Sequence, residues 1–473
     1  ANMDSLTAWT TLPNGQIDTV VINDSLRTLP IGGKFNGTYT IGATASDFST
    51  FNQAFDLMKL YGMCGPVIFE VKDGVYPERL KIGNIPGSSS VNTITITSQN
   101  QNKNLVLLGD TVSFPGLTDY TLNLTSGSHY VTFDKISFAN YASTGDYIVQ
   151  LDSAINDIYF NDCRFIGDNW SASPGGVLAN FDGRIDTIEF NRCDFIRLAK
   201  TIYIDNQYNT SHILIDSCNF LSPNSGFYVA YANDITLQNC FFESPATGTT
   251  PVDFQIASNV NLIGNHFENA YVHFASTDGG GYSNPSIIVN NFFSSISNIA
   301  LELSYSDYYK VYNNNIYGSG NFYAFYIHQS KELEVVNNNI YSSGTYNYTI
   351  QNSNPISYPI QSYNNNIFPA KIRYFTSLSN YTDFTTINSF FLASGLDSNS
   401  ISVDPIYVDP KDLHVLNPAL DGTAMVLPEI IDDIDKEMRN VLTPDIGADE
   451  VTFLGLDVLA YSLESPITIC EGN

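Results

Sequence analysis

The sequence predicts an all-β protein in which the chain winds into a right-handed parallel β-helix with an N-terminal amphipathic capping helix. The first observation is a short repeated phrase, such as Asn161-Asp-Cys-Arg-Phe165 and Asn337-Asn-Asn-Ile-Tyr341. The second is its spacing, because ten copies span 230 residues in nine intervals, a period of about 25–26 residues. The third is alternation, since apolar and polar residues alternate just before each copy, as in Ile158 and Phe160 around Tyr159. The aromatic residues that end the copies are Phe138, Phe165, Phe195, Phe220, Phe242, Phe267, Phe293, Tyr317, Tyr341 and Phe368.

A repeat of this length holds two or three short strands and cannot bury its own apolar face. Stacking copies on one another buries that face, with each coil about 4.8 Å above the last. We therefore expect a solenoid of roughly 13 to 14 coils, about 65 Å long.

The residue at the centre of each phrase is predicted to form a column inside the stack. Cysteine fills this slot first and asparagine later, in the order Cys163, Cys193, Cys218, Cys240, Asn265, Asn291, Asn315, Asn339 and Asn366. We expect the four thiols to be small buried hydrophobes and not disulfides, because pairing between adjacent coils has unfavourable geometry. Asparagine suits a corner, since it tolerates the left-handed backbone region, and its amide can bond to the coil above. The copies with three asparagines slip register by one residue. The outward slot before the buried aromatic residue holds an apolar row, Phe292, Ile316, Ile340 and Ile367, and we expect a loop to cover it, with a neighbouring module or fibre subunit as the alternative.

The two ends of the stack need covers. The segment from Asp47 to Gly62 has apolar residues at helical spacing and ends at a glycine, so it predicts a helix lying across the first coil. We therefore divide the chain into three parts. Residues 1–35 form an arm or the tail of a preceding module, and residues 36–450 form the β-helix with its caps. Residues 451–473 form a linker and the start of another module. Asp435, Arg439, Asp445 and Glu450 are expected to form a salt-bridged end cap.

Composition excludes several classes. The chain has 473 residues with 20 basic and 48 acidic side chains, a net charge of −28. An acidic protein without a basic patch is not an electrostatic nucleic-acid binder, and no apolar stretch of 18 residues predicts membrane insertion. The acidity is typical of an extracellular or cell-surface protein that stays soluble in salt.

Several segments resemble right-handed parallel β-helix proteins of the choice-of-anchor type from Bacteroidetes surfaces. The segments that carry the resemblance are Thr40–Gly42, Asp47–Phe48, Gly65–Phe69 and Gly74–Glu78 at the start and Asp433–Arg439 and Pro444–Glu450 at the end. Ile469–Asn473 is similar to the start of immunoglobulin-like modules in very long secreted proteins of that phylum. The resemblance implies a module of a large, multi-domain, adhesin-like protein exported by the type IX route. That group includes polysaccharide lyases, esterases and proteins without known activity, so the fold alone does not assign a function.

The best enzymatic candidate is a lyase site for acidic glycans formed by Arg192, Asp194, Arg197 and Lys200, because lyases of this kind need a basic residue beside groups that neutralise a uronate. The alternative is an ion pair between Arg164 and Asp194, which occupy equivalent outward slots on adjacent coils. Gly74–Glu78 also resembles the opening of pectin methylesterases, but the later motifs of those enzymes are missing.

Tyrosine crowds into two coils, and outward tyrosines offer a flat apolar face with a polar tip that suits sugars or proteins. The candidate binding residues are Tyr305, Tyr308, Tyr309, Tyr323 and Tyr326. Asp404, Asp409 and Asp412 are candidate Ca²⁺ ligands, with an ordinary acidic loop as the alternative. No other cofactor is expected, and His266 is expected to be a surface residue.

The sequence therefore favours a non-catalytic structural or adhesive module of a long secreted or cell-surface protein. Its expected partners are adjacent domains of the same polypeptide, and glycans or other surface proteins contacted through outward tyrosines and apolar rows. The alternative is a carbohydrate-active enzyme, such as a polysaccharide lyase on acidic glycans.

Overall fold

The computed structural model describes residues 4–9, 25–31, 33–109, 120–140, 147–152, 154–167, 176–177, 184–198, 200–221, 227–243, 250–295, 299–319, 323–352, 359–377 and 379–451. The segment 452–473, predicted to be a linker and the start of another module, lies outside these residues. In the arm predicted over 1–35, β1 (Asp4–Trp9) pairs antiparallel with β2 (Ser25–Ile31) as a two-stranded sheet of its own.

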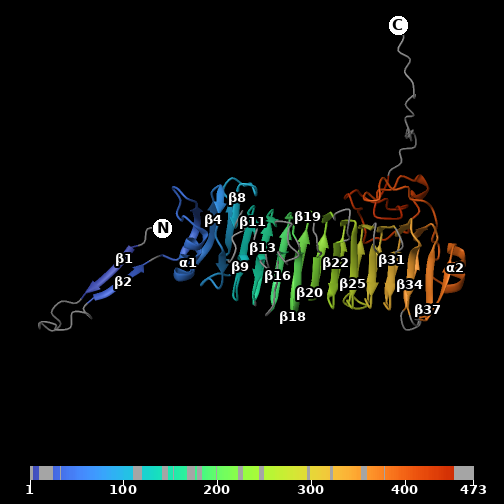
Figure 1. Ribbon diagram of the computed structural model, residues 1–473, viewed down its shortest axis with the longest axis horizontal. Helices are drawn as coiled ribbons and strands as arrows, with labels where there is room; N and C mark the ends of the chain where they lie inside the picture. Colours follow the sequence, from blue (N-terminus) through green and yellow to red (C-terminus); the bar gives the residue numbers. More distant parts are fainter. Residues whose placement is uncertain are drawn as a thin grey trace, which may run out of the picture.

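The rest is a parallel β-helix whose turns each pass through three sheets, as predicted (Figure 1). The first sheet contains β3 (Phe35–Ile41), β4 (Met63–Val71), β7 (Ile94–Ser98), β10 (His129–Asp134), β13 (Ile155–Asn161), β16 (Ile185–Asn191), the later parts of β18 (Lys200–Asp216) and β20 (Phe227–Gln238), β23 (Ser258–Ile263), β26 (Ser286–Val289), β29 (Tyr309–Tyr312), β32 (Leu333–Val336) and β35 (Ile360–Tyr363).

The second sheet is built of short strands that carry the repeated phrase. It contains β5 (Gly74–Tyr76), β8 (Val106–Gly109), β11 (Ser137–Ala139), β14 (Arg164–Ile166), β17 (Asp194–Ile196), β19 (Asn219–Leu221), β21 (Phe241–Glu243), β24 (His266–Glu268), β27 (Phe292–Ser295), β30 (Asn315–Gly318), β33 (Asn339–Ser342) and β36 (Asn366–Phe368).

The third sheet lies between the second and the next strand of the first. It contains β6 (Leu80–Ile82), β9 (Tyr120–Leu124), β12 (Tyr147–Leu151), β15 (Gly176–Val177), the early parts of β18 and β20, β22 (Thr250–Gln255), β25 (Ala270–Ala275), β28 (Leu301–Ser304), β31 (Tyr323–His328), β34 (Tyr346–Gln351), β37 (Ile372–Ser377) and β38 (Asn380–Phe384).

The solenoid has about 11 turns, fewer than the 13 to 14 predicted. The chain stops coiling soon after Phe368. It forms the last parallel strand β37, the antiparallel β38, helix α2 (Ile387–Ser394), and then a largely irregular segment containing the short helix η3 (Pro418–Leu420). We call residues 401–450 the cap. The cap packs along the side of the stack, so these residues add no coils (Figure 1).

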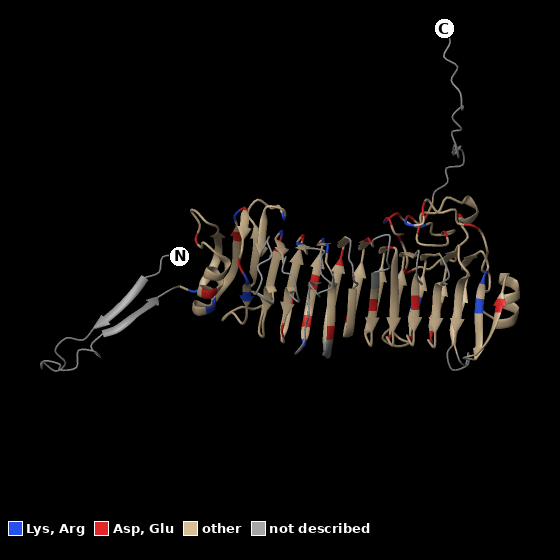
Figure 2. Cartoon of the chain, viewed as in Figure 1, with Lys and Arg blue, Asp and Glu red and all other residues tan. Residues whose placement is uncertain are grey.

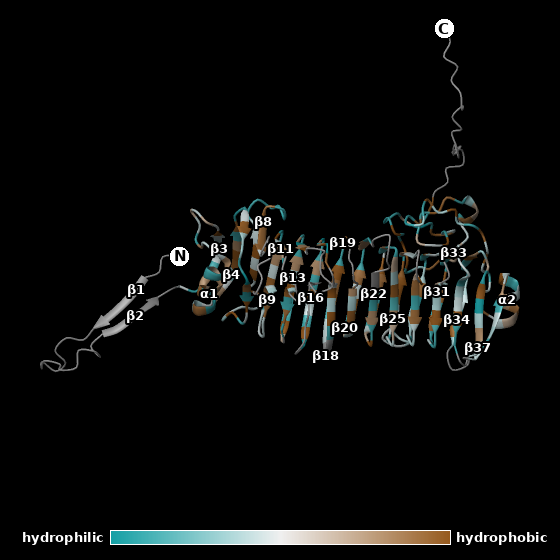
Figure 3. Ribbon diagram, viewed as in Figure 1, coloured by the Kyte–Doolittle hydropathy of each residue, from teal (hydrophilic) through white to brown (hydrophobic). Residues whose placement is uncertain are grey.

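The interior of the stack is filled with apolar side chains in columns. The strands of the solenoid accordingly carry many hydrophobic bands (Figure 3). Phe195, Phe220 and Phe242 stack in succession, with ring centroids 4.6 and 4.1 Å apart. Such ring pairs add roughly 0.5–1.5 kcal/mol beyond the area that they bury. The predicted thiol column is confirmed, because Cys163, Cys193, Cys218 and Cys240 are all buried and free.

A column of left-handed corners precedes the thiol column. Ten residues adopt φ between 49° and 63° at the corner between the first and second sheets, and they are Lys135, Asp162, Arg192, Ser217, Asn239, Gly264, Asn290, Asn313, Asn337 and Asn364. This confirms the predicted corner. In each triple-asparagine copy the first asparagine takes the corner, so the second one, not the third, continues the thiol column.

In the triple-asparagine copies, the predicted position of the buried column and the predicted position of the outward apolar row are therefore both wrong by one residue. The buried column runs through Asn314, Asn338 and Asn365 and not through the predicted Asn315, Asn339 and Asn366. The isoleucine of each copy, and not the aromatic residue that follows it, takes the core-facing position. Ile316, Ile340 and Ile367 face the core in register with Phe293, whereas Tyr317 and Tyr341 face outward. The predicted outward row of isoleucines does not exist, and Phe292 is covered by Leu413 and Ala448 of the cap.

The other asparagines of these copies hold the cap. Asn315 and Asn339 donate from their amides to the carbonyls of Leu413 and Ile446, at 2.8 and 3.1 Å. Asn337 exchanges two hydrogen bonds with the backbone of Met425, at 2.8 and 3.0 Å. The triple asparagines therefore serve two surfaces at once, the core ladder and the cap.

The N-terminal end is closed by the predicted helix, α1 (Phe51–Tyr61). Thr50 caps its first turn by accepting from the Gln53 N–H, and Gly62 ends it with φ of 71°, a conformation that suits glycine. Phe51, Phe55 and Met58 are buried against the first turns.

Candidate functional site

A row of outward side chains runs along the third sheet, one per turn. In register, the row is Tyr203, Tyr228, Asp253, His273, Glu302, Tyr326, Thr349 and Arg373. At about 4.8 Å per turn it extends for roughly 34 Å. The cap packs on the corner between the first and second sheets, so this row faces away from it.

A histidine lies between two carboxylates in this row. His273 Nδ1 is 3.1 Å from an Asp253 oxygen, and Nε2 is 3.9 Å from a Glu302 oxygen. Burial lowers the pKa of His273, but the hydrogen bond to Asp253 and the charge of Glu302 outweigh it, so the pKa lies above its usual value. Glu302 also accepts from the hydroxyls of Tyr271 and Ser304, at 2.5 and 2.6 Å. The carboxylates are therefore held in place by neighbouring donors.

Ring contacts continue from this cluster across four turns. His328 lies 5.0 Å from Tyr305 and 5.8 Å from Tyr326, centroid to centroid. Tyr323 lies 5.2 Å from Tyr326 and 6.0 Å from Tyr346. We call the aromatic platform the surface formed by Tyr271, His273, Tyr305, Tyr323, Tyr326, His328, Tyr346, Arg373 and Tyr381.

Arg373 closes the platform at its C-terminal end. Its guanidinium lies 4.1 Å from the ring centroid of Tyr346 and 3.9 Å from that of Tyr381, which is cation–π distance. The same group pairs with both oxygens of Asp383, at 2.7 and 2.9 Å. Its charge is thus already matched.

The charge of the platform is not positive. Asp253, Glu302 and Asp383 are set against Arg373 and His273, and acidic bands mark several strands of the solenoid (Figure 2). A polyanion would meet repulsion here, whereas an uncharged ligand with apolar faces and hydroxyls would meet rings and fixed hydrogen-bonding groups.

The five tyrosines predicted for binding separate into three places. Tyr305, which is 55% exposed, Tyr323 and Tyr326 belong to the platform. Tyr308 lies on the opposite side of the stack, in a hollow of about 220 Å³ at the outer face of the first sheet. Tyr309 is a correction, because it is fully buried with its hydroxyl donating to Thr277, so it cannot contact a ligand at the surface.

Within the described residues, Arg192, Asp194 and Arg197, which were predicted for a lyase, form no ion pair with one another. Arg192 and Arg197 are exposed at the corners before and after β17, with φ of 55° and 52°. Asp194 pairs with Lys103 at 2.8 Å. The side chain of Lys200 lies outside the part of the chain that the structure describes.

The alternative for that region is also corrected. Arg164 and Asp194 do share a register position, as predicted. However, the Arg164 guanidinium donates to Asn104 at 2.5 Å, and Lys103 bridges Asp194 and Asp162. The loop before β8 supplies the cation, and the sequence spacing gave no indication of that contact.

The predicted Ca²⁺ ligands do not converge on one point. Asp404 and Asp409 each accept from a backbone N–H two residues on, in separate tight turns, and Asp412 bonds to His414. Among the described residues these three carboxylates do not gather as a ligand group. His266 is not the free surface residue that was predicted, because the cap covers it and its Nε2 lies 2.6 Å from the Lys411 carbonyl oxygen.

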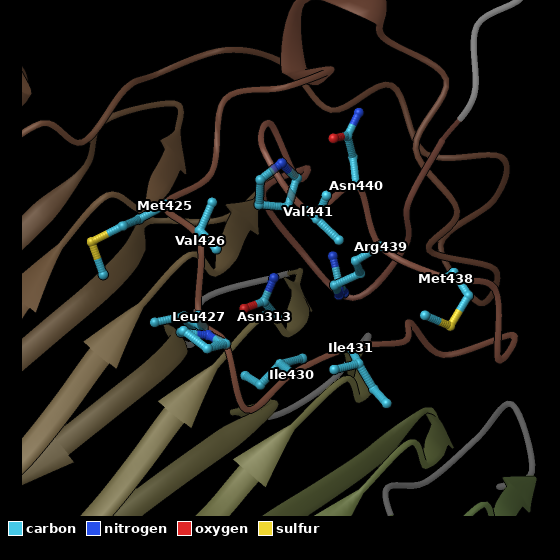
Figure 4. Close-up of a pocket in the computed structure, with 12 residues that line it drawn as sticks. Asn313, Met425, Val426, Leu427, Ile430, Ile431, Met438, Arg439, Asn440 and Val441 are labelled. Atoms are coloured by element: carbon cyan, nitrogen blue, oxygen red, sulfur yellow. The ribbon is translucent and has the colours of Figure 1, made fainter.

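The cap itself holds a hollow of about 290 Å³ (Figure 4). Its walls are mostly apolar, and Arg439 and Asn313 lie at its floor. Both polar groups are engaged within the protein, Arg439 with the Gly447 carbonyl and Asn313 with the same oxygen. The hollow thus presents few hydrogen-bonding groups to a ligand.

The predicted salt-bridged end cap is confirmed for one pair, because Arg439 and Glu450 lie 3.3 Å apart.

Sequence reasoning missed Tyr271, His273, Glu302, Tyr346 and Arg373. They lie on the third sheet, which the repeated phrase does not mark, and the segments before it vary in length. Aligning the alternating segments 270–275, 301–304 and 323–328 would have placed His273 and Glu302 side by side.

Comparison with known proteins agrees with this architecture. A family model described as a right handed beta helix region matches residues 200–387. The fold is a right-handed parallel β-helix. A search of curated proteins found no significant match.

Three solved structures illustrate the likeness of this β-helix to others. The pectin methylesterase from Aspergillus niger is 14% identical over 52% of this chain and 87% of that chain, with a TM-score of 0.31. Tailspike protein 3 of bacteriophage CBA120 is 11% identical over 74% and 62%, with a TM-score of 0.33. A pectate lyase is 11% identical over 89% of this chain and 98% of that chain, with a TM-score of 0.29.

Among the described residues, no helix has the length and apolar character needed to cross a membrane.

Proposed function

We propose that this β-helix is a non-catalytic adhesive module that binds an uncharged glycan on the aromatic platform. The observation that carries the proposal is the series of ring contacts from Tyr305 to Tyr346, which the Arg373 guanidinium continues to Tyr381, on a face that the cap leaves open. The module would belong to a long extracellular or cell-surface protein, of the Bacteroidetes choice-of-anchor type that the terminal motifs resemble, with adjacent domains of the same polypeptide as neighbours.

The rigidity of the platform supports binding. Most of its side chains stand on strands of a continuous sheet, and Tyr305 lies directly after β28, so little side-chain freedom is lost when a ligand binds to them. The Tyr326 hydroxyl is fixed by Gln351, and the Tyr271 hydroxyl by Glu302. The ring contacts extend over several successive turns, which favours an extended ligand.

The charge supports an uncharged glycan. The cations of the platform are already paired with its carboxylates. Its charge would therefore repel a polyuronate. A neutral polysaccharide avoids that cost.

The test is affinity electrophoresis and calorimetry against neutral polysaccharides, namely cellulose oligomers, xylan, mannan and β-1,3-glucan, beside polygalacturonate and alginate. We expect binding to at least one neutral polymer, weakened tenfold or more by Tyr326→Ala or Tyr305→Ala, since truncating a central aromatic typically costs about 2 kcal/mol. Tyr282→Ala is the matched control, because Tyr282 is 79% exposed and lines the hollow on the first sheet. Loss of binding in the control as well, or binding to polyuronates alone, would contradict the proposal.

The alternative activity is a lyase acting on acidic glycans. It is tested by following the absorbance of unsaturated product with polygalacturonate and alginate, with and without Ca²⁺. We expect no turnover. Ca²⁺-dependent turnover that disappears in Arg192→Ala would replace the adhesive proposal with the enzymatic one.

A further inference from the structure

Three segments of the cap, far apart in the sequence, bring a histidine and two aspartates together. His414, Asp435 and Asp449 each offer one ligand atom, and these atoms all lie within 4.8 Å of one another. His414 follows the turn at 409–412, Asp435 lies in the turn between Asp432 and Met438, and Asp449 lies at the end of the cap. The cluster is separate from the aromatic platform and does not depend on the function proposed for it.

The histidine is oriented by a carboxylate behind it. Asp412 bonds to Nδ1 of His414, which leaves Nε2 directed at Asp435, 2.8 Å away. A carboxylate that fixes one ring nitrogen while the other faces a ligand is the usual outer-shell arrangement of a metal-binding histidine. The edge of Phe292, 4.9 Å from the imidazole between centroids, further restricts the ring.

Asp449 is a largely buried carboxylate at the inner side of the cluster. The residue is 7% exposed, and its Oδ2 accepts from the backbone N–H of Val415 at 3.0 Å. A carboxylate with so little contact with water is costly to keep charged, and a cation bound beside it would lower that cost.

The local charge also calls for a cation. Asp412, Asp435 and Asp449 lie around the imidazole of His414, whereas Arg439, the cation that also acts on Asp449, is already paired with Glu450. Even a protonated His414 leaves the group negative. The nearby Lys411 does not compensate, because its ammonium pairs with Glu268.

We propose that His414, Asp435 and Asp449 bind one divalent transition-metal ion, with Zn²⁺ as the representative, and that the ion links the three segments of the cap. One imidazole nitrogen with two carboxylate oxygens suits Zn²⁺, which takes three or four such ligands at about 2.0–2.2 Å and completes its shell with water. Ca²⁺ suits the site less, because it needs 6–8 oxygen ligands. His414 and Asp435 are partly exposed, which leaves room for the water and a path for the ion.

The test uses the full chain, freed of metal with EDTA and titrated with Zn²⁺ by calorimetry. We expect one equivalent to bind, with a rise of a few degrees in the temperature at which the cap becomes susceptible to protease. Co²⁺ in place of Zn²⁺ should give the visible absorption of a four-coordinate ion. Ca²⁺ at the same concentration should produce neither effect.

Two variants decide the assignment. Asp435→Asn changes an exposed ligand and should fold normally while weakening Zn²⁺ binding at least tenfold, and His414→Ala should abolish the Co²⁺ spectrum. Asp404→Asn is the control, since it alters another exposed carboxylate of the cap that has no contact with the cluster. The proposal would be overturned if the unaltered protein bound no Zn²⁺. It would also be overturned if Asp435→Asn and His414→Ala left the Zn²⁺ affinity unchanged.

Discussion

The backbone N–H of Cys240 donates to the side-chain oxygen of Asn265 at 3.0 Å, at the turn where the thiol column becomes an amide column. In the turns before this point, the thiols of Cys218 and Cys240 accept from the backbone N–H of the column residue one turn earlier, Cys193 and Cys218, at 3.3 and 3.4 Å. Above it, Asn291 accepts from both the backbone and the amide of Asn265, at 2.9 and 3.0 Å. Thiol and amide therefore perform the same role, which is to satisfy a buried N–H at each corner.

This equivalence predicts an order of stability at Asn314. Its amide donates to the carbonyls of Ile288 and Tyr312, and its oxygen accepts from Asn291. Asn314→Ala should leave several buried groups unpaired and cost about 2–4 kcal/mol. Asn314→Cys should cost clearly less, because a thiol already fills this slot in four turns. Urea unfolding followed by circular dichroism measures both, and equal losses would refute the equivalence.

The thiols should differ sharply in reactivity. Burial raises the pKa of the Cys163 thiol well above its usual value, so it stays protonated at pH 8 and is also inaccessible. Cys64 is exposed. In the variant Cys470→Ser, which removes a thiol outside the described residues, we expect one thiol to react rapidly with Ellman's reagent and four only after denaturation. Cys64→Ser in addition should abolish the rapid phase.

Arg439 should control the docking of the cap. Its side chain is 4% exposed and donates to Asn290 of the solenoid at 3.0 Å and to the carbonyls of Asp432 and Gly447. Arg439→Ala should cost about 3–5 kcal/mol by leaving Glu450 buried without its cation. Hydrogen exchange should show faster opening over 401–450 and unchanged protection in β13–β25. Lys436→Ala, an exposed neighbour, is the control.

The cap should be more stable in mild acid than at neutral pH. Burial, aided by the charge of Glu450, raises the pKa of Asp445 to about 7 despite hydrogen bonds from the Gly422 and Val451 N–H groups. A carboxyl whose pKa is higher in the folded state contributes stability below its unfolded value near 4, and that contribution is lost as pH rises to 7. Cap opening by hydrogen exchange, corrected for intrinsic rates, should increase between pH 5 and 8. Asp445→Asn should flatten that slope.

The path of the chain could be predicted because the phrase with cysteine or asparagine marks one corner in every turn. The register of the triple-asparagine turns could not. Asn313, Asn314 and Asn315 have identical preferences, and each suits both a left-handed corner and a buried ladder. Only the positive φ of Asn313 decides which one enters the core.

The platform was harder to predict than the core. Tyr305, Tyr323 and Tyr326 stood out because tyrosines are concentrated there. His273 and Glu302 did not, since their proximity depends on pairing β25 with β28 across an intervening segment. Tyr309 was misassigned because its strand, β29, turns it inward onto Thr277, and sequence crowding does not reveal that direction.

The antiparallel pairing of β38 with β37 limits how copies of this protein can associate. The other strand pairs of the stack that the structure describes are parallel, so a second molecule could extend the solenoid only by adding a parallel strand. β38 reverses that polarity, and Arg373 with Asp383 fastens it in place. Head-to-tail polymerisation through this terminus is therefore blocked, and any fibre built from such molecules must grow through their sides.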